Sequence, residues 1–219
     1  MNKDDIEKAI EDLYTLLNRG YPKQYAVRFV GDHYGLKNED RYLLSRTVFP
    51  KSYILETKVK KTPLRELKGS HLSIDGYNVI ITTESLLMGE TFTSMDGLLR
   101  DIRNVSRKHR VTKTTLESVD LILGLLERYR PKESTFYLDK MMSQSGRLSE
   151  ILRNSMEQMG INGDSETITG VDYTLKNMEG IIATNDSAII SQVKRFIDLP
   201  SKLQNFQGKL THPLNSPKE

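Results

Sequence analysis

The sequence predicts an α/β protein whose mainly parallel sheet is flanked by helices and preceded by a small all-α domain. Apolar residues recur at helical spacing through the first 50 residues. From residue 70 onward, short β-prone runs alternate with longer helical runs, which is typical of βαβ units in a parallel sheet. A length of 219 residues with 37% hydrophobic content suits one α/β domain with a small appendage.

Residues 1–50 predict a bundle of three short helices. The first apolar stripe ends at Gly20 and the second, which begins near Pro22, ends at Gly35, because glycine suits a helix C-terminus. Asn38 is the expected cap of a third helix, which runs to Pro50. Such a bundle suits either a helix-turn-helix variant that binds nucleic acid or a purely structural role.

The charge of the chain is concentrated near its N-terminal third. Residues 21–68 carry a net charge of +6, whereas the whole chain carries +3. This segment is either a polyanion-binding surface or a lysine-rich face that contacts only water. Within it, residues 51–69 show little periodicity and predict a basic connector, in which Lys58, Lys60 and Lys61 are candidate substrate contacts.

Residues 70–199 predict the α/β domain, and residues 200–219, with three prolines, predict a loose tail. The expected strands cover residues 71–74, 91–93, 134–138, 166–169, 180–183 and 195–197, and the expected helices cover 79–88, 112–130 and 148–159.

Composition excludes several kinds of chemistry. The chain contains no cysteine, so thiol catalysis, disulfides, cysteine-ligated zinc and iron–sulfur clusters are excluded. The histidines are isolated, so a bound metal is expected to have oxygen ligands, as Mg²⁺ and Mn²⁺ prefer. The N-terminus lacks a signal peptide and no run reaches about 20 apolar residues, so we expect a cytoplasmic protein without membrane association.

Aspartates follow several of the predicted strands. Asp75 and Asp139 end two of them, Asp186 follows a third almost at once, and Asp172 opens a short helix beyond a fourth. Ligands bind at the carboxyl ends of strands in an open parallel sheet, so these carboxylates are expected to converge on one cleft. Each aspartate taken singly is better explained as a helix cap or turn residue, and the four together are the stronger signal.

Converging carboxylates imply a bound cation, because like charges at short range raise each other's pKa. A divalent cation there can lower the pKa of a water molecule and stabilise charge on a phosphodiester oxygen. The pattern therefore predicts an Mg²⁺ or Mn²⁺ site of a hydrolytic nuclease.

Two motifs resemble the PIN-like nuclease superfamily, in particular its NYN branch. LSIDGYNVI, which contains Asp75 and Asn78, is similar to the first motif of that superfamily. IIATNDSAII, which contains Thr184 and Asp186, is similar to the last one. Asp172, 14 residues before Asp186, and Asp139 match further acidic positions. The resemblance covers residues 70–198, and the whole chain also resembles an uncharacterised prokaryotic family of unknown function.

The resemblance implies a PIN-like domain that acts as a metal-dependent endoribonuclease. Asp75, Asp139, Asp172 and Asp186 would hold one or two cations. Asn78 would orient Asp75 or contact a phosphate, and Thr184 would support the metal-bound water. The family's second acidic position has no clear match, and the candidates for it are Asp96 and Asp101, with Glu84 a weaker one.

Other residues are candidates for substrate binding. Ser143 and Ser145, with Arg147 beside them, precede a helix whose N-terminus can receive a phosphate, although they suit a simple capping role at least as well. Arg100 and Arg103 face either a backbone phosphate or water.

Three functional hypotheses follow from these patterns. The first is a ribonuclease acting on RNA in preference to DNA, and the second is an inactive RNA- or DNA-binding protein on the same fold. The third is a phosphate-ester hydrolase or a nucleotide-binding protein that acts on small molecules. The sequence leaves open whether the chain forms a homodimer.

Overall fold

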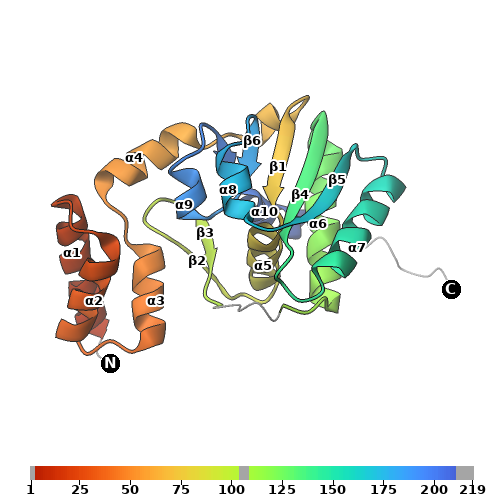
Figure 1. Cartoon of the computed structure of the whole chain (residues 1–219). Helices are drawn as coiled ribbons and strands as arrows, with labels where there is room; N and C mark the ends of the chain where they lie inside the picture. Colours follow the sequence, from red (N-terminus) through yellow and green to blue (C-terminus); the bar gives the residue numbers. More distant parts are fainter. Residues whose placement is uncertain (1–2, 104–108, 211–219) are drawn as a thin grey trace.

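The structure, a computed structural model, describes residues 3–103 and 109–210 (Figure 1). Its centre is a five-stranded sheet in the order β5-β4-β1-β6-β7, in which all neighbours are parallel. The predicted α/β class with a parallel sheet is confirmed. The strands are β1 (His71–Asp75), β4 (Glu133–Asp139), β5 (Gly163–Ile168), β6 (Ile181–Ala183) and β7 (Phe196–Ile197).

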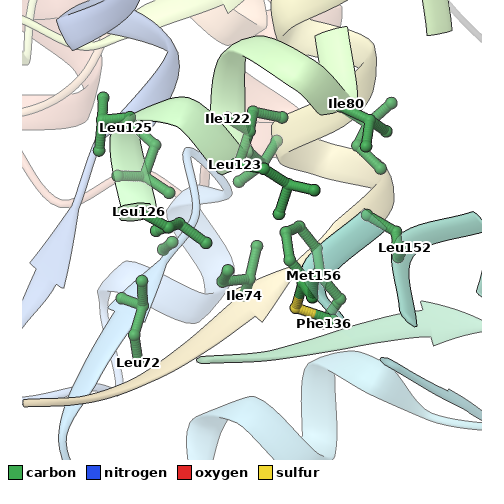
Figure 2. Packing of buried hydrophobic residues seen from close by; sticks show 14 of the residues in the cluster. Leu72, Ile74, Ile80, Ile122, Leu123, Leu125, Leu126, Phe136, Leu152 and Met156 are labelled. Atoms are coloured by element: carbon green, nitrogen blue, oxygen red, sulfur yellow. The ribbon is translucent and has the colours of Figure 1, made fainter. Parts of the chain in front are cut away.

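Alternating side chains of these strands build one core on each face of the sheet. Leu72 and Ile74 of β1 and Phe136 of β4 pack against four helices, as Figure 2 shows for most of this cluster. These helices are α5 (Gly76–Leu87), α6 (Lys113–Tyr129), α7 (Ser145–Gln158) and α10 (Leu199–Leu210). On the other face, Tyr137 and Ile182 pack with α8 (Val171–Lys176) and α9 (Ser187–Ile190). The sheet is therefore covered on both sides, as parallel sheets usually are.

The N-terminal region is helical, as predicted. Its helices are α1 (Lys3–Asn18), α2 (Lys23–His33) and α3 (Asn38–Thr47), which share a core of their own that includes Leu13, Val30 and Leu44. Asn38 is not the cap of α3, because Lys37 occupies that position and makes no side-chain capping bond. Among the helices of the described ranges, none combines the length and apolar composition that a membrane span requires.

The predicted connector is mostly helical. Its main elements are α4 (Lys51–Lys60) and a short 3-10 helix, η1 (Leu64–Leu67). Lys60 Nζ donates to the carbonyls of Ile190 and Ser191, 3.0 Å away in each case, and Thr57 is buried. Helix α4 was not predicted, because contacts with α9, rather than an amphipathic stripe, position it.

The segment between α5 and α6 contains a small hairpin. The expected strand at residues 91–93 is β2 (Thr91–Thr93), which pairs in antiparallel fashion with β3 (Leu99–Asp101). Strand β3 was not predicted, because its Arg100 and Asp101 are charged. Both are buried in ion pairs.

The predicted loose tail is wrong for its first half. Residues up to 210 form helix α10, in which Leu199 and Leu203 are fully buried against α5 and α6. Pro200 is compatible with the helix because it lies in the first turn, where no backbone donor is needed. Residues 211–219 lie outside the described residues.

Candidate active site

A cleft of about 570 Å³ lies at the carboxyl ends of the central strands. Asp75 ends β1, Asp139 ends β4, Asp172 lies in the first turn of α8 and Asp186 caps α9. All four line this cleft. The structure thus brings together the aspartates that the sequence analysis placed at one sheet edge.

Asp75 is the deepest of the four carboxylates. Its residue is only 8% exposed, and its Oδ2 accepts a hydrogen bond from Thr184 Oγ1 at 2.9 Å. The pKa of Asp75 is raised to about 7, chiefly by burial and then by the nearby charges of Asp186 and Asp172, while the Thr184 hydroxyl opposes the shift. Asp75 therefore carries a charge at neutral pH only against an electrostatic cost.

Gly76 lets the chain turn from β1 into α5 at this point. A Cβ atom on Gly76 would lie 2.5 Å from Leu138 Cδ2 and 3.0 Å from the Tyr137 carbonyl oxygen. Glycine is thus required directly after Asp75, because α5 begins against the backbone of β4. The DG pair of the first motif reflects this close approach.

The other three aspartates lie nearer to the mouth of the cleft. Asp139 accepts from the Met141 backbone N–H at 2.8 Å, and Asp186 accepts from the Ala188 N–H at 2.6 Å. The pKa of Asp172 is raised, first by loss of water around it and then by the charge of Asp186. The capping bonds use part of the acceptor capacity of Asp139 and Asp186, and each carboxylate still has free lone pairs.

The arginines of the cleft do not neutralise these four aspartates. Arg46 pairs with Asp101, and Arg103 lies near Glu84 and Glu90. The aspartates therefore form a cluster of like charges, whose repulsion adds to the larger effect of burial in raising the pKa values of Asp75 and Asp172.

The donor set fits a hard divalent cation that keeps much of its water. All the candidate ligands are carboxylate oxygens, which Mg²⁺ and Mn²⁺ prefer. Over residues 3–103 and 109–210, no three acidic or histidine side chains are already arranged to hold a metal ion together.

Asn78 and Thr184 order the loop that carries Asp186. Asn78 Oδ1 accepts from the backbone N–H of Asn185 at 2.7 Å, and Thr184 Oγ1 accepts from the N–H of Asp186 at 3.1 Å. Because Thr184 also donates to Asp75, one hydroxyl links the Asp75 carboxylate to the backbone of Asp186. Asn78 lines the cleft as expected, and its amide oxygen fixes the neighbouring loop.

Two of the predicted site residues lie elsewhere. Asp96 and Arg100 form a buried ion pair of 2.6 Å in the β2–β3 hairpin, and neither lines the cleft. Arg100 also donates to the Asn185 carbonyl at 2.6 Å. Asp96 as a metal ligand and Arg100 as a phosphate contact are therefore corrected to structural roles.

The remaining candidates for the second acid differ in their partners. Asp101 lines the cleft and accepts from Arg46 Nη2 at 2.8 Å. Glu84 is buried, with His109 Nε2 at 2.9 Å and the Thr115 hydroxyl at 2.6 Å. Asp101 is thus the only one of these candidates in the described cleft lining.

Of the predicted substrate contacts, only Arg103 lines the cleft. Ser143 and Arg147 are exposed outside it, while Ser145 is buried as the first residue of α7, whose N-cap is Gln144. The expected capping role of these serines is therefore wrong, because the residue before the helix is a left-handed glutamine with a φ of 62°.

The three predicted lysines, Lys58 and Lys60 of α4 and Lys61 directly after it, also lie outside the cleft lining. Lys60 binds carbonyls of α9 and pairs with Glu56, and Lys61 donates to the Gly97 carbonyl at 3.0 Å. Lys58 is exposed on α4. Two of the three lysines therefore hold α4 against the α/β domain.

The sequence analysis missed the contribution of the helical region to this cleft. Tyr42 and Arg46, both on α3, line it together with Tyr77 and Tyr173. No motif marks these residues. The basic segment 21–68 was the only signal, and it does not single out Arg46.

Comparison with known proteins assigns no activity. Residues 64–202 match the family model described as "Domain of unknown function (DUF5616)", and residues 5–60 match "Protein of unknown function (DUF434)". The uncharacterized protein MJ0935 of Methanocaldococcus jannaschii is 39% identical over 197 residues, which are 89% of this chain and 94% of that protein. No solved structure matches the chain.

Proposed function

The chain belongs to the family described as a domain of unknown function (DUF5616), and on that premise we propose that it is a metal-dependent ribonuclease with a PIN-like, NYN-type active site. The observation that carries the proposal is the buried Asp75, whose pKa is raised to about 7 beside Asp172 and Asp186 in an open cleft. A carboxylate held at this electrostatic cost favours a cation-binding role.

The residues of the cleft would divide the work as follows. Asp75, Asp139, Asp172 and Asp186, which all line the cleft, would together hold one or two Mg²⁺ or Mn²⁺ ions. When bound, the cation supplies a water of lowered pKa and stabilises negative charge on the phosphodiester. Thr184 fixes the direction of the Asp75 carboxylate, since its hydroxyl donates to Oδ2. Arg103 would contact the phosphate backbone of the RNA.

Cleavage assays on end-labelled RNAs and DNAs, single-stranded and structured, test this proposal. We expect cutting with Mg²⁺ or Mn²⁺, none with a chelator, and none in Asp75→Asn or Asp186→Asn. Asparagine caps a helix as well as aspartate does, so Asp186→Asn should keep α9 folded. Asp164→Asn is the matched control, because Asp164 is an exposed acid on β5 outside the cleft lining. Absence of cutting on every substrate would refute the proposal.

An inactive nucleic-acid-binding protein on the same fold is the alternative. The ion pair between Asp101 and Arg46 favours this alternative, because Asp101 is the acid best placed to complete the metal site and its carboxylate is already bound by Arg46. In that case RNA binding would persist in Asp75→Asn while no variant, the parent included, cleaved RNA.

A further inference from the structure

The helical region supplies part of the cleft that contains the carboxylates. Helix α3 contributes Tyr42 and Arg46 to the lining, and the β2–β3 hairpin contributes Asp101. The two regions also bond directly, since the Tyr42 hydroxyl lies 3.4 Å from the Arg103 carbonyl oxygen and the Met95 N–H lies 3.0 Å from the Thr47 carbonyl oxygen. The helical region thus forms one wall of the candidate active site.

The guanidinium of Arg46 is only partly used in this wall. Nη2 donates to Asp101 at 2.8 Å and Nη1 donates to the Tyr42 hydroxyl at 2.8 Å. Nε is buried and has no hydrogen-bond partner. The edge formed by Nε and Nη2 therefore makes one bond where it can make two parallel ones, and an unpaired buried N–H is costly.

Resting on the proposed nuclease function, we propose that Arg46 binds a backbone phosphate of a polynucleotide and exchanges Asp101 for it. A phosphate presents several oxygens and can accept from Nε and Nη2 together, which a single oxygen of Asp101 does not do. The charge-assisted pair with Asp101 holds Arg46 in place when no substrate is present. The substrate is accordingly a polymer whose strand runs between α3 and the sheet edge, with one phosphate at the carboxylates and another at Arg46.

A purely structural ion pair between α3 and the hairpin is the competing explanation. The side chain of Arg46 is 26% exposed and that of Asp101 is 8% exposed, so this pair has moderate structural value. The two explanations differ in one respect. If the pair restrains Arg46, removing Asp101 frees the arginine and strengthens polynucleotide binding. If the pair is only structural, removing either partner lowers stability and does not strengthen polynucleotide binding.

Binding of a short fluorescein-labelled oligoribonucleotide, followed by anisotropy in chelator at several salt concentrations, tests the proposal. Arg46→Gln should weaken binding roughly tenfold and lower the salt slope by about one, because one phosphate contact is lost. Arg46→Lys keeps the charge without the two-bond edge and should fall between. Arg28→Gln is the matched control, since Arg28 carries the same charge on α2 with 81% of its side chain exposed, outside the cleft lining.

The pairing with Asp101 is tested by a double-mutant cycle. Asp101→Asn should tighten binding several-fold in the parent chain but not in the Arg46→Gln background, because only Arg46 is released. An equal gain in both backgrounds would mean a general charge effect and would overturn the proposal. So would an Arg46→Gln variant that binds like Arg28→Gln. Thermal unfolding of each variant shows that the fold is intact.

The outcomes separate this proposal from the nuclease proposal, because binding is measured without metal. Binding that depends on Arg46, with no cleavage under any condition, would refute the nuclease and keep the phosphate contact. Metal-dependent cleavage, together with RNA binding that Arg46→Gln leaves unchanged, would support the nuclease and refute the phosphate contact of Arg46.

Discussion

The β2–β3 hairpin region and the edge of the parallel sheet both contain buried carboxylates, but among the described residues only those of the hairpin region have basic partners. In the hairpin, Asp96 is fully buried and pairs with Arg100, whose guanidinium is buried beside it. At the sheet edge, Asp75 is buried with a hydroxyl and two further aspartates as its neighbours. The first arrangement pairs the acid with a basic side chain, whereas no basic side chain is among the described groups that shift the pKa of Asp75.

Burial alone therefore does not mark a functional acid. The β2–β3 region compensates its acids throughout, since Asp101 pairs with Arg46 and Asp198, beside the hairpin, lies 3.7 Å from Lys61. The pKa of Asp75, by contrast, is raised to about 7 by burial and by Asp186 and Asp172. Removing a carboxylate should therefore have opposite effects on stability in the two places.

The largest effect is expected in the hairpin. Asp96→Asn removes the charge that balances buried Arg100 and should lower the free energy of unfolding by about 3–5 kcal/mol, because an uncompensated guanidinium remains inside. Urea denaturation measures this loss, and Asp164→Asn, an exposed change, serves as the control. A loss below about 1 kcal/mol would show that the charge of Asp96 is not needed to stabilise buried Arg100.

Metal binding should have the next largest effect, and only at the sheet edge. At a free Mn²⁺ or Mg²⁺ concentration about 100 times its Kd, the free energy of unfolding should rise by about 2.7 kcal/mol. Thermal unfolding with and without chelator measures this gain. Asp75→Asn should abolish it and Asp164→Asn should retain it. The same gain in both variants would place the ion elsewhere.

Asp75 should also make stability depend on pH in a defined direction. Its pKa is about 7 in the folded chain and 3.8 ordinarily, so the folded chain keeps its proton to higher pH. The cost of ionisation is absent below about pH 4, grows as pH rises through the interval and is fully present above pH 7.

In chelator, Asp75→Asn should therefore raise the free energy of unfolding at pH 8 by about 2 kcal/mol and have little effect near pH 4. Denaturation curves at a series of pH values give both quantities. A variant that is less stable than the parent at pH 8 would contradict the uncompensated state of Asp75.

The smallest predicted effect concerns Thr184. Thr184→Val removes the hydroxyl that donates to Asp75 and accepts from the Asp186 N–H, so the free energy of unfolding should fall by about 1 kcal/mol. The pKa of Asp75 should rise further, because the hydroxyl now opposes its shift. Carboxyl NMR titration of Asp75 measures that rise, and Thr184→Ser, which keeps the hydroxyl, should show none. An unchanged titration in Thr184→Val would remove Thr184 from the site.

Local sequence patterns predicted most of the α/β elements and failed where contacts between distant residues decide. Helix α6 begins next to Thr112, its expected start, because Thr112 and Thr115 form a reciprocal capping pair within one turn. Helix α4 has little periodicity of its own and was taken for a connector, although Lys60 bonds to carbonyls 130 residues away. Helix α10 was missed because three prolines near the C-terminus suggested an extended tail, whereas Leu203 is buried in the core.

That Asp75, Asp139, Asp172 and Asp186 share one edge follows from the sequence, because parallel strands all end on the same side and each aspartate follows a strand closely. Which acids near that edge have a counter-charge depends on contacts that form only in the folded chain. Asp101 and Arg46 are 55 residues apart in the sequence. Asp96 and Arg100 are close in the sequence, but their burial depends on the fold around them. Charge compensation depends on the distance between the charged groups and on the exclusion of water from them. The local pattern of apolar residues predicts neither.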